Sequence, residues 1–191
     1  QEGWYDSMRI IVDAYGGDHA PLEVLKGCEM AVREYGVEVA LCGRESDLRA
    51  VMAERRISDD GFCILEAPGV IPVEEDPTEL VKSYKNGSMA VGFQNLADGH
   101  GDAFVTAGST GAAVVGASLI VKRLGGVKRA ALASIIPNTD RYYMLLDIGA
   151  NAECRPEMLQ QFGIMGSVYM DKVMGVQKPR VGLINIGAEE T

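Results

Sequence analysis

Short apolar runs alternate with amphipathic stretches along most of this chain. Seven short runs predict strands, and these fall at residues 9–14, 37–43, 62–67, 103–106, 129–136, 142–149 and 180–187. Most of the intervening segments carry apolar residues at helical spacing. This alternation is typical of a layered α/β domain with a largely parallel sheet.

The predicted helices begin and end at recognisable signals. Pro21 suits a first helical turn, and Gly36 ends the helix that follows it. Ser46 is expected to cap the next helix. Further helices are predicted at residues 88–97, at residues 111–124 before Gly125 and Gly126, and from Pro156 onward.

Composition narrows the class of protein. The chain has 191 residues and a formal charge of −9, which argues against wrapping of nucleic acid. Its four cysteines are dispersed and its two histidines lie far apart, so we expect reduced thiols, no metal site and a cytoplasmic location. No segment approaches the roughly 18 apolar residues of a membrane span, and no signal peptide is visible.

The two ends lead to further expectations. Residues 1–7 fit no predicted element and are expected to be a non-native or disordered leader before Met8. The chain stops just after the strand predicted at residues 180–187. Ligands bind outside the carboxyl ends of such strands, so we expect this chain to be the N-terminal part of a longer protein.

Four of the predicted strands end in glycine-containing polar turns. The turns read DAYGGD at residues 13–18, TAGSTG at 106–111, DIGAN at 147–151 and NIGAEE at 185–190. Each could be a plain turn, with Asp18 capping a helix in the first. The carboxyl ends of parallel strands meet at one edge, so the sequence predicts that all four turns gather there as a site.

The turn at Gly108–Gly111 is the best candidate for binding an anion. It joins a predicted strand to a predicted helix, where free N–H groups and the helix dipole favour negative charge. Ser109 and Thr110 add hydroxyl donors, although a hydroxyl cap alone would explain them equally well. The segment is neither a Walker loop nor a dinucleotide fingerprint. His19, in the first turn, could also donate to a phosphate.

Two basic groups stand out in this acidic chain. They are either solvated faces or a docking surface for an acidic partner or a phosphate. Their members are Lys82, Lys85, Lys122, Arg123, Lys128 and Arg129.

Four segments together resemble the bacterial phosphate acyltransferase family. They read IVDAYGGDHAP, DAFVTAGSTGA, LLDIGANAECRPEMLQQFGIMGSVY and RVGLINIGAEE, and the resemblance runs from Met8 to Thr191. It implies a three-layer, Rossmann-like fold of the isocitrate/isopropylmalate dehydrogenase type. Residues 8–191 would be the N-terminal part of a single acyltransferase domain. The implied reaction transfers a fatty acyl group from acyl carrier protein to inorganic phosphate, giving acyl phosphate for phospholipid synthesis.

The resemblance also implies roles for individual residues. Phosphate is its own nucleophile, so no cofactor or catalytic triad is expected, and the protein must position the reactants and stabilise the oxyanion. Thr110 and Asn151 are the expected catalytic residues, and Asp13, Asp18 and Asp147 are expected to orient loops. Phosphate or the acyl group would contact Gly16, Gly17, Asp18, His19, Gly108, Ser109, Gly111, Gly149, Ala150, Gly187 and Glu189. The acidic carrier would dock on the six basic residues.

The sequence also leads to an expectation about the oligomeric state and to several alternative functions. The family resemblance implies a homodimer with peripheral membrane contact through the missing part. The nearest alternatives are a phosphotransacetylase-like enzyme that uses acyl-CoA and a relative of the NAD-dependent decarboxylating dehydrogenases. A non-catalytic module that recruits acyl carrier protein is a third, and a plain α/β domain is the last.

Overall fold

The computed structural model describes residues 8–184, which form two compact units. The first unit ends at Lys122 and the second begins at Arg123. The prediction that residues 8–191 belong to a single domain stays a prediction.

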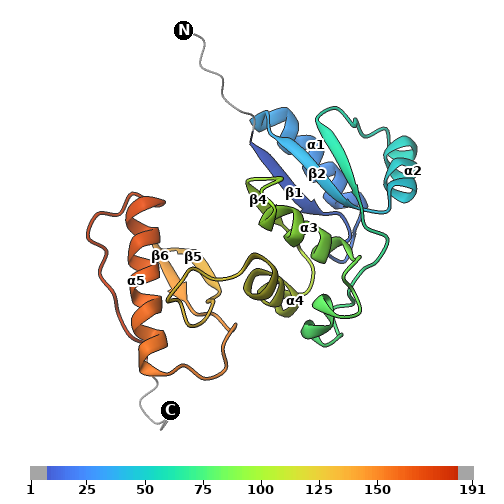
Figure 1. Cartoon of the computed structure of the whole chain (residues 1–191). Helices are drawn as coiled ribbons and strands as arrows, with labels where there is room; N and C mark the ends of the chain where they lie inside the picture. Colours follow the sequence, from blue (N-terminus) through green and yellow to red (C-terminus); the bar gives the residue numbers. More distant parts are fainter. Residues whose placement is uncertain (1–7, 185–191) are drawn as a thin grey trace. The chain divides into compact units, whose positions relative to one another are not determined.

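A four-stranded parallel sheet organises the first unit (Figure 1). Its strands are β1 (Arg9–Asp13), β2 (Glu38–Gly43), β3 (Phe62–Glu66) and β4 (Ala103–Val105), in the order β3-β2-β1-β4. Val12 of β1 is in register with Leu41 of β2 and Val105 of β4. Since β1 and β4 are parallel neighbours, the turns that follow them begin side by side.

Helices cover both faces of this sheet, as the alternation of side chains requires. Val12 and Leu41 pack in one core with residues of α1 (Leu22–Tyr35) and α2 (Glu45–Arg55). Ile11 points the other way, into a core that includes residues of α3 (Ser88–Ala97). The unit therefore has the three α/β/α layers that the sequence predicts.

The N-terminus of α2 differs from the prediction. The helix begins at Glu45 after Arg44, so Ser46 is not its cap. The Glu45 N–H donates to Oε2 of Glu66 at 2.9 Å. A carboxylate at the end of β3 therefore provides an acceptor that the sequence assigned to Ser46.

Short helices pack beside α3. They are η1 (Pro77–Val81), α4 (Thr110–Gly116) and the π-helical η2 (Ala117–Val121). Leu80, Phe93 and Ala112 share their core. The helix predicted over residues 111–124 ends three residues early, because Lys122 adopts a φ of 74° that does not continue a helix.

The second unit contains a hairpin and one long helix. Strands β5 (Ala133–Pro137) and β6 (Tyr142–Leu146) form an antiparallel two-stranded sheet. The sequence predicts both strands, and the connection closed by Asn138 N–H and the Arg141 carbonyl is too short for a parallel crossover, so they form a hairpin outside the parallel sheet.

Helix α5 (Pro156–Lys172) begins at the predicted proline and buries Met158, Phe162 and Met170. Residues 180–184 of the predicted last strand are not a strand, and residues 185–187 lie outside the described part. No helix within residues 8–184 is long and apolar enough to cross a bilayer.

Candidate functional site

Hydrogen bonds join the turns after β1 and β4. Asp13, the last residue of β1, is 3% exposed, and its Oδ2 accepts from the Thr106 hydroxyl at 2.7 Å. The same hydroxyl oxygen accepts from Gly108 N–H at 3.0 Å. Oδ1 of Asp13 accepts from Tyr15 N–H at 3.1 Å. The prediction that Asp13 orients loops is therefore confirmed.

Glycine is required where these two turns meet. A Cβ at Gly16 would lie 2.8 Å from Gly108 N, from Asp13 Oδ2 and from Thr106 Oγ1. Two of these atoms belong to a hydrogen-bonded pair and the third to the main chain, so none can move away cheaply. The predicted glycines of the two turns are therefore in close contact.

A small cavity of about 140 Å³ lies beside this contact. Four predicted site residues line it together, namely Gly16, Gly17, Asp18 and Gly108. Met89 from α3 and Ile71 add an apolar wall. The side chain of His19 is exposed and is not among the lining residues.

The turn at Gly108–Gly111 divides its side chains between structure and solvent. Ser109 is 6% exposed and caps α4, with its Oγ accepting from Ala112 N–H at 3.3 Å. Thr110 is the first residue of α4 and is exposed. First-turn N–H groups such as those of Thr110 and Gly111 have no acceptor within the helix. The capping role is therefore present at Ser109, and Thr110 keeps a side chain open to a ligand.

Asp147 organises the turn after β6 in the second unit. It accepts from Leu132 N–H at 2.7 Å, from Ala150 N–H at 3.1 Å and from Asn151 twice, through N–H at 2.8 Å and Nδ2 at 3.0 Å. Burial alone would raise the pKa of Asp147, but these hydrogen bonds, led by the Asn151 side chain, outweigh burial and lower the pKa below its usual value. The loop-orienting role predicted for this residue is confirmed.

The hydrogen bonds of the Asn151 side chain use its nitrogen and leave its oxygen. Its Nδ2 group donates to the Ala130 carbonyl at 2.9 Å and to Asp147 Oδ2 at 3.0 Å. Both amide hydrogens are therefore used, since a carboxamide nitrogen carries two. Oδ1 remains for a ligand, and it can only accept. In this arrangement the Asn151 side chain has no N–H left to donate to an oxyanion. A catalytic role of this side chain would therefore have to use Oδ1 as an acceptor.

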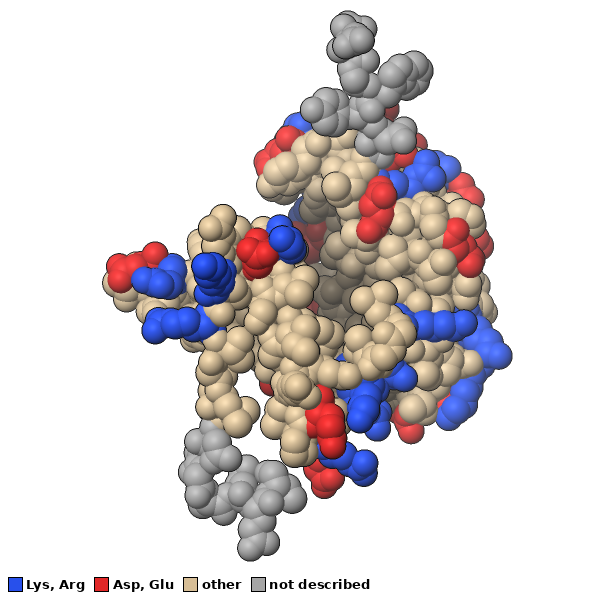
Figure 2. Space-filling view, turned by 60° about the vertical axis from the view of Figure 1, so that its left-hand side comes forward, with Lys and Arg blue, Asp and Glu red and all other residues tan. Residues whose placement is uncertain are grey.

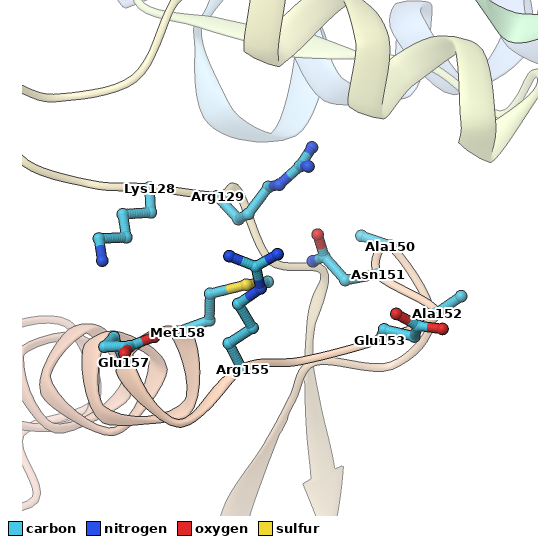
Figure 3. Close-up of a pocket in the computed structure, with 9 residues that line it drawn as sticks. All are labelled: Lys128, Arg129, Ala150, Asn151, Ala152, Glu153, Arg155, Glu157 and Met158. Atoms are coloured by element: carbon cyan, nitrogen blue, oxygen red, sulfur yellow. The ribbon is translucent and has the colours of Figure 1, made fainter. Parts of the chain in front are cut away.

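An open cavity of about 610 Å³ lies against this turn (Figure 3). The sequence predicted four of its lining residues, Lys128, Arg129, Ala150 and Asn151. Sequence reasoning missed Arg155, whose guanidinium points into the cavity toward Asn151. The available signal was its place directly before the proline that opens α5.

The remaining predicted basic residues come from both units. Lys82, Lys85 and Lys122 belong to the first unit, and Arg123 to the second. Lys82 pairs with Glu79 at 3.0 Å. Figure 2 shows basic side chains in several separate groups on the face in view.

The four turns do not share one sheet edge. The turns after β1 and β4 do, but the turn at residues 147–151 follows a strand of the separate hairpin, so this part of the prediction is wrong. Gly149 lies in that turn with a φ of 122°. Gly187 and Glu189 lie outside the described residues. Within residues 8–184, no three His, Cys, Asp or Glu side chains are arranged to hold a metal ion.

Comparison with protein families gives a match over residues 8–191 to the family described as "Fatty acid synthesis protein". A phosphate acyltransferase of Desulforamulus reducens is 42% identical over 96% of this chain and 55% of its own length. Another, from Desulforudis audaxviator, is 45% identical over 95% of this chain and 53% of its own length. The chain thus spans about half the length of these curated relatives.

Two solved structures share the fold. The EutD phosphotransacetylase from Staphylococcus aureus aligns with a TM-score of 0.64 and 19% identity, over 86% of this chain and 53% of its own. A phosphotransacetylase from Streptococcus pyogenes aligns with a TM-score of 0.63 and 17% identity, over 89% of this chain and 55% of its own. At these identities the likeness concerns the fold.

Proposed function

This chain belongs to the phosphate acyltransferase family, described as fatty acid synthesis protein, and we propose that the protein transfers a fatty acyl group from acyl carrier protein to inorganic phosphate. The product is an acyl phosphate for phospholipid synthesis. The observation that carries the proposal is the 42–45% identity with phosphate acyltransferases over nearly the whole chain.

The chemistry requires positioning more than a protein nucleophile. A phosphate oxygen attacks the thioester carbonyl carbon, a tetrahedral oxyanion forms, and the C–S bond then breaks. The carrier leaves as a thiolate that takes up a proton. An enzyme accelerates such a step by aligning the two substrates and by placing fixed donors where negative charge develops.

We assign phosphate to the turn at Gly108–Gly111. Its support is the exposed hydroxyl of Thr110 beside first-turn N–H groups, held in place by the Asp13–Thr106–Gly108 hydrogen bonds. Gly16, Gly17, Asp18 and His19 would form the rim of this site.

The acyl-thioester end is assigned to the turn at Gly149–Asn151, with Gly187 contributing from the end of the predicted last strand and Glu189 from the segment after it. Asn151 holds this turn through Asp147 and offers Oδ1 as an acceptor. The six basic residues named from the sequence would receive the acidic carrier. A homodimer, an isocitrate dehydrogenase-type fold and a cytoplasmic location with peripheral membrane contact complete the proposal.

The test uses the protein at its full natural length. It is mixed with long-chain acyl carrier protein and inorganic phosphate, and acyl phosphate is trapped with hydroxylamine. We expect hydroxamate that depends on phosphate. Thr110→Ala should raise the phosphate concentration needed for half-maximal rate by roughly tenfold, the worth of a hydrogen bond to a charged group. Thr139→Ala, on the exposed hairpin turn, is the matched control and should change nothing.

Three other outcomes would contradict the proposal. Turnover of acyl-CoA but not of acyl carrier protein would make the protein a phosphotransacetylase-like enzyme. Carrier binding without any product would indicate a recruiting module. Full activity of Thr110→Ala at low phosphate would remove the Gly108–Gly111 turn from the phosphate site.

A further inference from the structure

The cavity around Arg155 is lined by more positively than negatively charged side chains. Three cationic side chains line it, from Lys128, Arg129 and Arg155. Within the described part of the chain, none of these three side chains forms an ion pair. The carboxylates of residues 8–184 therefore leave this positive charge unpaired.

Two carboxylates also line the cavity but do not neutralise it. Figure 3 shows Arg155 between Glu153 and Glu157, with its guanidinium directed toward Asn151 and Arg129 rather than toward either carboxylate. One excess positive charge remains locally, in a chain whose formal charge is −9. Like charges at one cavity repel each other, so a bound anion would relieve the repulsion.

The start of α5 adds to this field. Arg155 is the residue before the first turn of this 17-residue helix, and its side chain makes no cap hydrogen bond. The positive end of the helix dipole lies at the same place. A guanidinium offers a planar fork of donors that matches phosphate oxygens, which an ammonium group does not.

The volume and the polar lining of the cavity limit the class of ligand that it could bind. The volume of about 610 Å³ is within the range of sites for small organic ligands and well above the needs of a lone phosphate ion. Oδ1 of Asn151 adds an acceptor that the Ala130 and Asp147 contacts leave free. The lining therefore suits a phosphate group attached to an organic segment that carries N–H donors.

We propose that the cavity lined by Lys128, Arg129 and Arg155 binds a phosphate group of a substrate, with Arg155 as its principal donor. The inference rests on the proposed function for the source of that group. Two sources exist in that reaction, the phosphodiester of the amide-containing phosphopantetheine arm that carries the acyl thioester, and inorganic phosphate. The cavity volume and the Asn151 acceptor favour the arm.

Binding is measured first, by calorimetry on the full-length protein, with free phosphopantetheine and inorganic phosphate as separate probes. Arg155→Ala should weaken phosphopantetheine binding by about tenfold or more, and Arg155→Lys should restore only part of it. Arg141→Ala removes the same charge from the exposed hairpin turn of the same unit and should stay within twofold of the unmodified protein. Circular dichroism and thermal unfolding establish that each variant is folded.

Kinetics then distinguish the two sources. A rise in KM for acyl carrier protein, with KM for phosphate unchanged, assigns the cavity to the arm. The converse assigns it to inorganic phosphate and retains the phosphate-group site. If Arg155→Ala leaves both affinities within twofold of the unmodified protein, the proposal is overturned. An unmodified protein that forms no acyl phosphate would refute the proposed function alone, because the calorimetry tests the cavity without turnover.

Discussion

Removing the Asp147 carboxylate should loosen the turn that forms one wall of the larger cavity. Four donors converge on this group at 2.7 to 3.1 Å, three of them main-chain N–H groups. Asp147→Ala deletes the acceptor and leaves those N–H groups to water. Asn151 loses two of its contacts at once, so its side chain should no longer be held toward Ala130.

The size of the effect follows from the contacts. A hydrogen bond to a charged group contributes about 1.5–3 kcal/mol, and a typical one about 1 kcal/mol. Asp147 is only partly buried, and water replaces part of what is lost, so we take about 2 kcal/mol for opening the turn. At about 1.4 kcal/mol per factor of ten, this is roughly a 30-fold faster exchange of the protected amides.

Amide hydrogen exchange reports this directly at Leu132, Ala150 and Asn151. Asp140→Ala, a carboxylate on the exposed hairpin turn, is the control and should leave all three rates unchanged. The reasoning would be refuted if the three amides exchanged at their normal rates in Asp147→Ala. It would also be refuted if Asp140→Ala accelerated the exchange of the three amides as much as Asp147→Ala does.

The same carboxylate gives a pH dependence. The pKa of Asp147 is lower in the folded chain than its usual value, so its stabilisation is present above about pH 4 and is lost as the pH falls through the folded-state pKa. The Leu132 amide should therefore exchange progressively faster, after correction for intrinsic rates, only below about pH 4. In Asp147→Asn this acid-dependent step should disappear.

Three further predictions concern the first unit. Thr106→Val should lower the free energy of unfolding by about 1–3 kcal/mol more than Thr106→Ser, which keeps the hydroxyl bound to Asp13; urea unfolding of both variants would contradict this if they were equally stable. Gly16→Ala should cost about 2 kcal/mol or more, because its Cβ would meet main-chain and hydrogen-bonded atoms, whereas Gly27→Ala, with open space in α1, should gain up to about 1 kcal/mol. Burial raises the pKa of the Cys42 thiol to about 12, so iodoacetamide at pH 8 should label exposed Cys63 before Cys42 in the folded protein, and equal labelling by peptide mass spectrometry would contradict the buried environment.

The central sheet could be predicted because its signals are local. Apolar runs at β1 to β4 are separated by helical stretches or by connections long enough for a parallel crossover. The pairing of β5 with β6 does not follow from the apolar runs, because an apolar run carries no information about its partner. The short connection between Pro137 and Tyr142 does carry it, since a parallel connection needs a dozen or more residues.

The sequence predicts which turns form the candidate site, but it does not predict the directions of the hydrogen-bonding groups within those turns. Glycine and polar residues after a strand mark the turns at Gly16 and Gly108 from the sequence alone. The direction of the Asn151 amide depends on Ala130, which is 21 residues away, and on the four-donor arrangement at Asp147. The place of Arg155 in the cavity lining depends equally on the fold of the segment between β6 and α5, which has no helical or strand periodicity that could predict it.

The same arrangement of hydrogen bonds recurs at both turns and is relevant to the proposed anion sites of this acidic chain. In each, an aspartate at or just after the end of a strand accepts at least one N–H group of its own turn and a donor from another segment, Thr106 for Asp13 and Leu132 for Asp147. The carboxylate is turned inward against the loop it holds. The start of α4 in one unit and the Arg155 guanidinium in the other stay open, although Asp18 lines the smaller cavity and Glu153 and Glu157 line the larger one. In the proposed function, a formal charge of −9 does not prevent phosphate recognition, because local donors and not the global field would decide what these turns bind.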